Sequence, residues 1–138
     1  MTLQDHQILT VRTEGPGFYE ITDTVQACVK GSGVVTLFIQ HSSASLLIQE
    51  NADPDVQHDL KAFFRRLAPH ADAPQMAWLT HRLEGPDDMP AHIKAALLPT
   101  SLQIPVIGGR LALGRWQGIF LVEHRDQPHD RTIVLTQH

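Results

Sequence analysis

VVTLFIQHSSASLLIQENADPDVQHDLKAFFRRL, residues 34–67, is the stretch that decides the fold. It begins with the β-branched and apolar segment 34–39, which follows a Gly-Ser-Gly turn and therefore predicts a strand. A His-Ser-Ser sequence at 41–43 then interrupts the apolar residues, which resume over 44–48. Polar groups concentrated between two apolar segments are the first indication of a functional site.

An amphipathic helix follows in the same stretch. Asp53, Pro54 and Asp55 form its start signal, because Asp is a good N-cap and Pro and acidic residues suit the first helical turn. The apolar residues that follow recur with the 3.6-residue period of a helix with one buried face. They are Val56, Leu60, Phe63, Phe64 and Leu67.

The rest of the chain carries further strand and helix signals. Pro105 indicates an edge strand or a bulge, because proline cannot donate to a ladder. The last three strands are joined by short turns and are expected to be antiparallel. The sequence thus predicts one α+β domain, residues 1–138, in which two or three helices pack on an antiparallel sheet. Strands are expected over 7–13, 18–21, 75–80, 101–106, 111–113, 117–124 and 131–137, and helices after Thr22 and Asp88.

Composition limits the classes of function. The 138-residue chain is 42% hydrophobic and 19% charged, as in a globular protein. Its net charge of −4 argues against a nucleic-acid binder, which needs a basic surface. The single cysteine, Cys28, permits no intramolecular disulfide. Neither a secretory signal nor an apolar run long enough for a membrane span is recognised, so a cytoplasmic location is expected.

Four of the nine histidines end or begin predicted elements, where rigid backbone favours site building. His81 and His92 flank an acidic segment, 82–91. Two or three neutral imidazoles with a carboxylate would suit a divalent transition metal with an open coordination position. A structural role is the alternative for each histidine. The four are His41, His81, His92 and His124.

A phosphate site is the other chemistry that the residues suggest. Anions are favoured at helix N-termini, such as the one expected near Asp88. Arg110 and Arg125 lie in a turn and at a strand end, where their planar guanidinium groups could reach phosphate oxygens, and Ser43 could donate a hydrogen bond. Alternatively, these arginines are surface residues that bind no phosphate and only contribute to solubility. The nucleotide-binding patterns GxGxxG and GxxxxGK[ST] and the nucleophile pattern GxSxG are absent.

Three blocks in order resemble a known family: HSSASLLIQENADPDVQHDL at 41–60, EGPDDMPAHIKAALL at 84–98 and IPVIGGRLALGRWQGIFLVEHRD at 104–126. They are similar to the YjbQ family of small bacterial and archaeal proteins, also labelled secondary thiamine-phosphate synthase. The sequence departs from the family pattern at Pro99, where glycine is usual, and at Arg115, where threonine is usual.

The resemblance implies a compact α+β domain with a β-sandwich-like sheet, assembled as a homotrimer. It also implies weak thiamine phosphate synthase activity, which joins hydroxymethylpyrimidine pyrophosphate to thiazole phosphate and releases pyrophosphate. A divalent metal, zinc or magnesium, is expected, and the expected partner is a small phosphorylated metabolite. The candidate residues are His41, Glu50 and Asp53 for catalysis, Ser43, Arg110 and Arg125 for phosphate, and His81, His92 and His124 for metal.

Two alternatives stay open at this point. The same histidines would serve a metal-dependent hydrolase of unknown substrate. The chain could also be a non-enzymatic module that binds a phosphorylated metabolite, in which case ligand would stabilise the protein without turnover.

Overall fold

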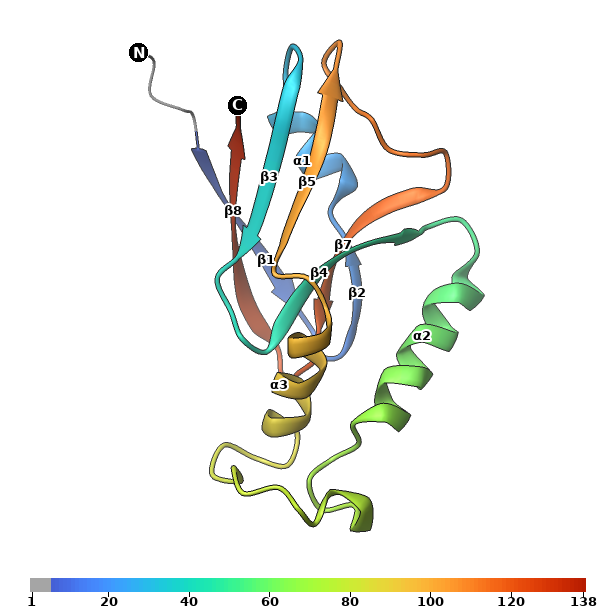
Figure 1. Ribbon diagram of the computed structural model, residues 1–138, viewed down its shortest axis with the longest axis vertical. Helices are drawn as coiled ribbons and strands as arrows, with labels where there is room; N and C mark the ends of the chain where they lie inside the picture. Colours follow the sequence, from blue (N-terminus) through green and yellow to red (C-terminus); the bar gives the residue numbers. More distant parts are fainter. Residues whose placement is uncertain (1–5) are drawn as a thin grey trace.

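Two antiparallel sheets form the body of the computed structural model, which describes residues 6–138 (Figure 1). The larger sheet has five strands and the smaller sheet three, and each paired strand runs antiparallel to its neighbour. In spatial order the larger sheet contains β1 (His6–Thr13), β8 (His129–Gln137), β3 (Gly33–Ile39), β5 (Ser101–Ile107) and β6 (Arg110–Leu111). The smaller sheet contains β2 (Gly17–Glu20), β7 (Gln117–Glu123) and β4 (Ala44–Glu50).

Three α-helices and one 3-10 helix are described along residues 6–138: α1 (Thr22–Cys28), α2 (Pro54–Leu67), η1 (Pro74–Met76) and α3 (Asp88–Leu97). Figure 1 shows α3 beyond one end of the strands, α2 standing to one side of the body, and the long connection between them at the extreme end of the molecule. The helices α2 and α3 and this connection therefore lie around one end of the sandwich. None of the described helices is long and apolar enough to cross a membrane.

The core lies between the inner faces of the two sheets. Along β3 every second residue is buried, beginning at Val35, as expected for a strand with one face in the core. Leu46 of β4 and Ile119 and Leu121 of β7 are buried in the same cluster. The middle strand of the smaller sheet, β7, is also buried on its outer face, where Phe120 makes an edge-to-face contact with Phe18. The α+β class and the sandwich-like arrangement are confirmed.

The start signal of α2 is confirmed in detail. Asp53 is the N-cap and its Oδ1 accepts a hydrogen bond from the Asp55 amide at 2.9 Å, with Pro54 as the first helical residue. The expectation for Pro105 also holds, because β6 covers only the last two residues of β5 and leaves most of that strand at the edge of the sheet.

The predicted strand over 75–80 is wrong. These residues form η1 and the turns after it, and Met76 and Leu79 pack on Ala71 in a small second cluster. Two backbone carbonyls of this segment, those of Leu79 and Met76, accept hydrogen bonds from the Arg82 guanidinium at 3.0–3.1 Å. The same guanidinium donates to the Ala71 carbonyl at 3.0 Å. A side chain thus replaces the ladder that the sequence pattern suggested.

Three smaller expectations also change. Thr22 begins α1 but does not cap it, because its hydroxyl accepts from the Ile119 amide and donates to Glu20. The strand expected over 111–113 is the two-residue β6. Strands β7 and β8 are joined by a short turn, yet they pair in different sheets, because the chain crosses the sandwich between them.

Candidate metal centre

Four side chains converge beside the N-terminus of α3: His81, Glu84, Asp88 and His92. One ligand atom from each lies within 4.8 Å of the others. The Oδ2 atom of Asp88 is central, since it lies 2.8 Å from Nε2 of His81 and 3.2 Å from Nε2 of His92. Nε2 of His81 is also 3.2 Å from a carboxylate oxygen of Glu84. We call these four residues the α3 cluster.

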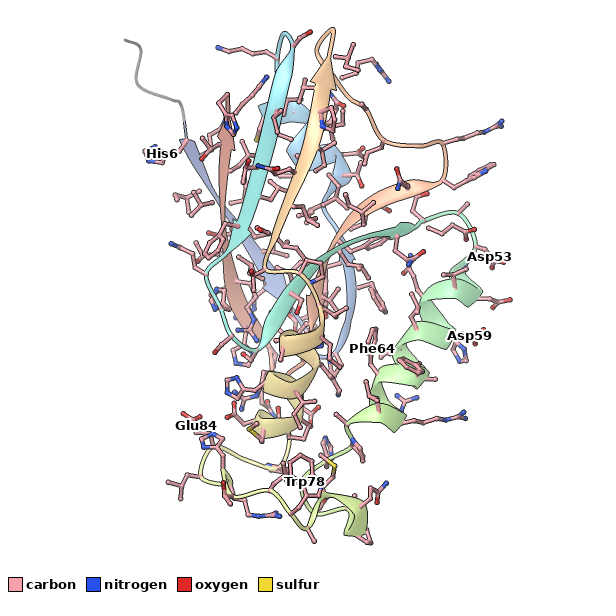
Figure 2. The ribbon with its side chains drawn as sticks, viewed as in Figure 1. His6, Asp53, Asp59, Phe64, Trp78 and Glu84 are labelled. Carbon is pink, nitrogen blue, oxygen red and sulfur yellow. The ribbon has the colours of Figure 1, made fainter. Side chains whose placement is uncertain are left out.

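The helix supplies half of the cluster through its own geometry. Asp88 and His92 are four residues apart, so they lie on the same face of α3 one turn apart. His81 and Glu84 come from the connection before the helix, which the Arg82 hydrogen bonds and the second apolar cluster hold in place. Figure 2 shows Glu84 at this end of the molecule, beside the first turn of α3.

Neighbouring groups orient the two central donors. Nδ1 of His92 lies 2.9 Å from the backbone carbonyl oxygen of Ser42, so an N–H on Nδ1 donates to it and leaves Nε2 free to bind a metal. Arg125 bridges two acids, with Nε 2.8 Å from Asp87 Oδ2 and Nη1 2.8 Å from Asp88 Oδ1. Its Nη2 donates to the Glu84 carbonyl at 3.2 Å. Arg125 thereby holds Asp88 in position.

The protonation of the cluster follows from these contacts. Burial opposes ionisation of Asp88, but hydrogen bonds from His81 and the charges of His92 and Arg125 outweigh it and hold the pKa of Asp88 below its usual range. The hydrogen bond to Asp88 raises the pKa of His81, against a smaller opposing effect of burial. Asp88 is therefore ionised at neutral pH, as a metal ligand must be.

The donor chemistry of the cluster fits a divalent metal. Two imidazole nitrogens and two carboxylate oxygens match the ligands that zinc uses, whereas magnesium prefers oxygen alone. Asp88 is buried, but His81 and Glu84 are exposed, so one side of the cluster is open to solvent. Such an open side would leave room for water or substrate in the coordination shell.

Only some of the residues singled out by sequence lie together. His81, His92 and Arg125 meet at the α3 cluster. Each guanidinium nitrogen of Arg125, the residue expected to bind phosphate, contacts a protein oxygen in this structure.

His41 and Ser43 belong to a neighbouring buried network. Arg131 and Glu123 form an ion pair there, with Nε of Arg131 2.8 Å from Oε1 of Glu123, and both side chains almost fully buried. Ser43 accepts from Arg131 at 3.0 Å, and Nε2 of His41 accepts from the Thr132 amide at 2.8 Å. Burial and the Arg131 charge lower the pKa of His41. The 41–43 segment thus connects this network to the α3 cluster through the Ser42 carbonyl.

His124 lies outside the α3 cluster. It is buried, and its Nε2 is 3.0 Å from the hydroxyl of Ser45 on β4. Burial, with the nearby charge of Lys94, lowers the pKa of His124 to about 4, so the ring is neutral at pH 7. The structure places it with the smaller sheet instead of with the other metal candidates.

Three further candidates lie away from the cluster. Glu50 accepts from the Asp53 amide at 3.1 Å, and Asp53 caps α2, so both carboxylates serve the β4–α2 turn. Figure 2 shows Asp53 at the start of α2, on the other side of the molecule from Glu84. Arg110 is exposed in the β5–β6 hairpin, at the far end of the sheets from α3 (Figure 1).

Sequence reasoning did not assign Glu84 and Asp88 as ligands. The i, i+4 spacing of Asp88 and His92 at a predicted helix start was the available signal, because it puts a carboxylate and an imidazole on one face. The buried pair of Glu123 and Arg131 had no local signal, because the two residues lie on strands of different sheets.

Comparison with known proteins places this chain in a family. The sequence profile described as UPF0047 protein YjbQ-like matches residues 7–138. A UPF0047 protein of Synechocystis sp. is 49% identical over 97% of this chain and 92% of its own length, and UPF0047 protein YjbQ of Escherichia coli O157:H7 is 41% identical over 93% of each.

Solved structures agree with this assignment. A conserved hypothetical protein of Thermus thermophilus superposes with a TM-score of 0.84 at 38% identity, covering 96% of this chain and 99% of its own. An uncharacterized YjbQ/UPF0047 family protein of Clostridium acetobutylicum gives a TM-score of 0.81 at 32% identity, covering 96% and 99%. From its sequence and its fold, the chain belongs to the YjbQ-like UPF0047 family.

Proposed function

We propose that this protein is a metal-dependent enzyme that acts on a phosphorylated small molecule. The observation that carries the proposal is the α3 cluster, in which two imidazoles and two carboxylates meet on an open side of the protein. A divalent ion bound there would neutralise charge on a phosphate or pyrophosphate leaving group. Weak thiamine phosphate synthesis, the activity implied by the family resemblance, is the reaction that we propose first.

The residues of the chain would prepare this site in defined ways. Ser42 fixes the tautomer and direction of His92, and Arg125 fixes the Asp88 carboxylate. These outer contacts reduce the reorganisation needed when an ion or a substrate binds. His81 and Glu84 are exposed donors on the connection before α3, so they lie where a ligand from solvent arrives first.

A turnover assay tests the proposal. Protein stripped of metal is incubated with hydroxymethylpyrimidine pyrophosphate and thiazole phosphate, with zinc, magnesium or no metal added, and pyrophosphate release is measured. Activity should require added metal and should be lost in His92→Ala, while the exposed His58→Ala variant keeps it. Release by the stripped protein, or unchanged turnover in His92→Ala, would overturn the assignment.

A metal-dependent hydrolase is the second candidate, and the imidazole donors favour it. Two histidines in the cluster point to zinc more than to the magnesium that commonly accompanies pyrophosphate. Release of inorganic phosphate from phosphate monoesters, with zinc and without a second substrate, would support this candidate. Binding that raises thermal stability with no turnover of either kind would support a phosphometabolite-binding module instead.

We also propose that the chain assembles as a homotrimer. Its edges and helix surface support assembly: most of β5 is left at a sheet edge, and Phe63 and Leu67 of α2 are exposed. Sedimentation equilibrium at micromolar concentration should give three times the chain mass of 15.4 kDa. A monomer at that concentration would remove the trimer.

A further inference from the structure

A cavity of about 540 Å³ lies on the outer face of the smaller sheet, between that sheet and the helices α2 and α3. Phe64 reaches into it from α2, and Figure 2 shows this side chain on the side of α2 that faces the body of the molecule. Phe18 and Val122 line it from the sheet and Pro90 from α3. Its volume and apolar walls suit a small ring-containing ligand.

The acidic groups at the cavity already have cationic or imidazole partners. Asp87 pairs with Arg125 at 2.8 Å, and Asp126 lies 2.8 Å from the His70 ring. Glu123 pairs with the buried Arg131. The charges of Asp87 and Glu123 are therefore compensated by arginines within the protein.

The basic groups at the cavity are not compensated in this way. Lys61, Arg65 and Lys94 all line it, and within residues 6–138 none of them has a carboxylate oxygen within 4.0 Å. Lys94 is half-buried, and burial lowers the pKa of its ammonium despite the opposing charges of Asp126 and Asp87. Arg65 is close enough to act on Lys94 by charge repulsion. Among the described residues, neither cation has an acid in direct contact, and two such neighbouring cations form a region where an anion is stabilised.

We propose that this cavity binds a small organic anion whose apolar ring packs on Phe64 and whose phosphate or carboxylate group is held by Lys94 and Arg65. The proposal goes beyond the proposed function, because it requires neither a metal nor turnover. It also separates two faces of α3. Asp87, Pro90 and Lys94 face the cavity, whereas Asp88 and His92 face the α3 cluster.

Isothermal titration calorimetry with four simple probes tests the site: phenyl phosphate, benzoate, phenol and benzylamine. One of the two aromatic anions should bind at least about tenfold more tightly than phenol, because a charged hydrogen bond is added to the same ring. Benzylamine should show no binding. The tighter of phenyl phosphate and benzoate identifies the anionic group.

Matched variants locate the binding. Lys94→Gln should weaken the preferred anion about tenfold and leave phenol unchanged, and Arg65→Gln should act in the same direction. Lys30→Gln, an exposed lysine elsewhere, should have no effect. Zinc binding by Lys94→Gln should equal that of the unaltered chain. A failure of the anion-binding proposal can therefore be distinguished from a failure of the proposed metal centre. Equal affinity for phenol and both anions, no effect of Lys94→Gln, or a cavity that binds no probe because another copy of the chain covers it would each overturn the proposal.

Discussion

Acidification from pH 7.5 to pH 5 should destabilise this protein through His124. The ring is buried against β4, with the positive charges of Lys94 and Arg131 nearby and only the Glu123 carboxylate favouring protonation. In the folded protein these surroundings lower the pKa of His124 from 6.5 to about 4. In the unfolded chain the ring is solvated and takes up a proton near its ordinary value.

The sign and the size of the change in the free energy of unfolding follow from this difference between the folded and unfolded pKa of His124. A group that is harder to protonate when folded stabilises the protein fully above its unfolded pKa, and this stability is lost as the pH falls toward the folded pKa. Between 6.5 and about 4 the loss for His124 amounts to about 3 kcal/mol, of which about 2 kcal/mol is lost by pH 5. Most of the effect therefore precedes titration of ordinary carboxylates.

Urea unfolding of the unaltered chain and of His124→Gln, at equal protein concentration, measures this loss of stability. The free energy of unfolding of the unaltered chain should fall by about 2 kcal/mol more than that of the variant between the two pH values, a midpoint difference of about 1 M urea. His58→Gln, which removes an exposed imidazole, should behave as the unaltered chain does. An equal fall in the His124→Gln variant would refute the reasoning.

Three further predictions concern the buried ion pair and the α3 cluster. Arg131→Met should lower the free energy of unfolding by about 3–5 kcal/mol in urea unfolding, because the Glu123 carboxylate is left buried without its partner. Adding Glu123→Gln should recover most of this loss of stability. A double variant no more stable than Arg131→Met would contradict the prediction. Asp88→Asn should weaken zinc binding at least about tenfold by calorimetry, and His58→Gln should not. Zinc affinity should fall as the pH drops through the raised pKa of His81, because proton and metal compete for its Nε2, and a flat profile would argue against that ligand.

Local signals predicted the parts of the fold that local forces determine. The 34–39 strand and the Asp53 cap of α2 were confirmed, because β-branched residues and a capping carboxylate act on their own neighbours. The 75–80 segment failed for the converse reason. Tertiary contacts determine its conformation instead of its strand-like pattern, because Arg82 satisfies backbone carbonyls that a neighbouring strand would otherwise pair. Nothing in the sequence indicated that the chain passes from one sheet to the other after β7, because a short turn normally joins paired strands.

The site residues likewise include some that the sequence indicates and some that only the fold reveals. His81 and His92 were recognised as metal candidates from residue type and position, and the structure brings them together. His124 looked alike in sequence, at the end of an apolar strand, but its burial depends on α2 and α3 packing over the smaller sheet. Glu123 lies near the end of the strand expected over 117–124, and only the fold shows the arginine that makes its burial tolerable.

Anomalous diffraction from crystals soaked in zinc tests the central claim most directly, namely that side chains eleven residues apart in sequence hold one divalent ion. One strong peak per chain is expected, about 2.0–2.2 Å from Nε2 of His81, from Nε2 of His92 and from a carboxylate oxygen of Asp88. A map with no peak among these atoms, or with zinc bound at His124 instead, would contradict it.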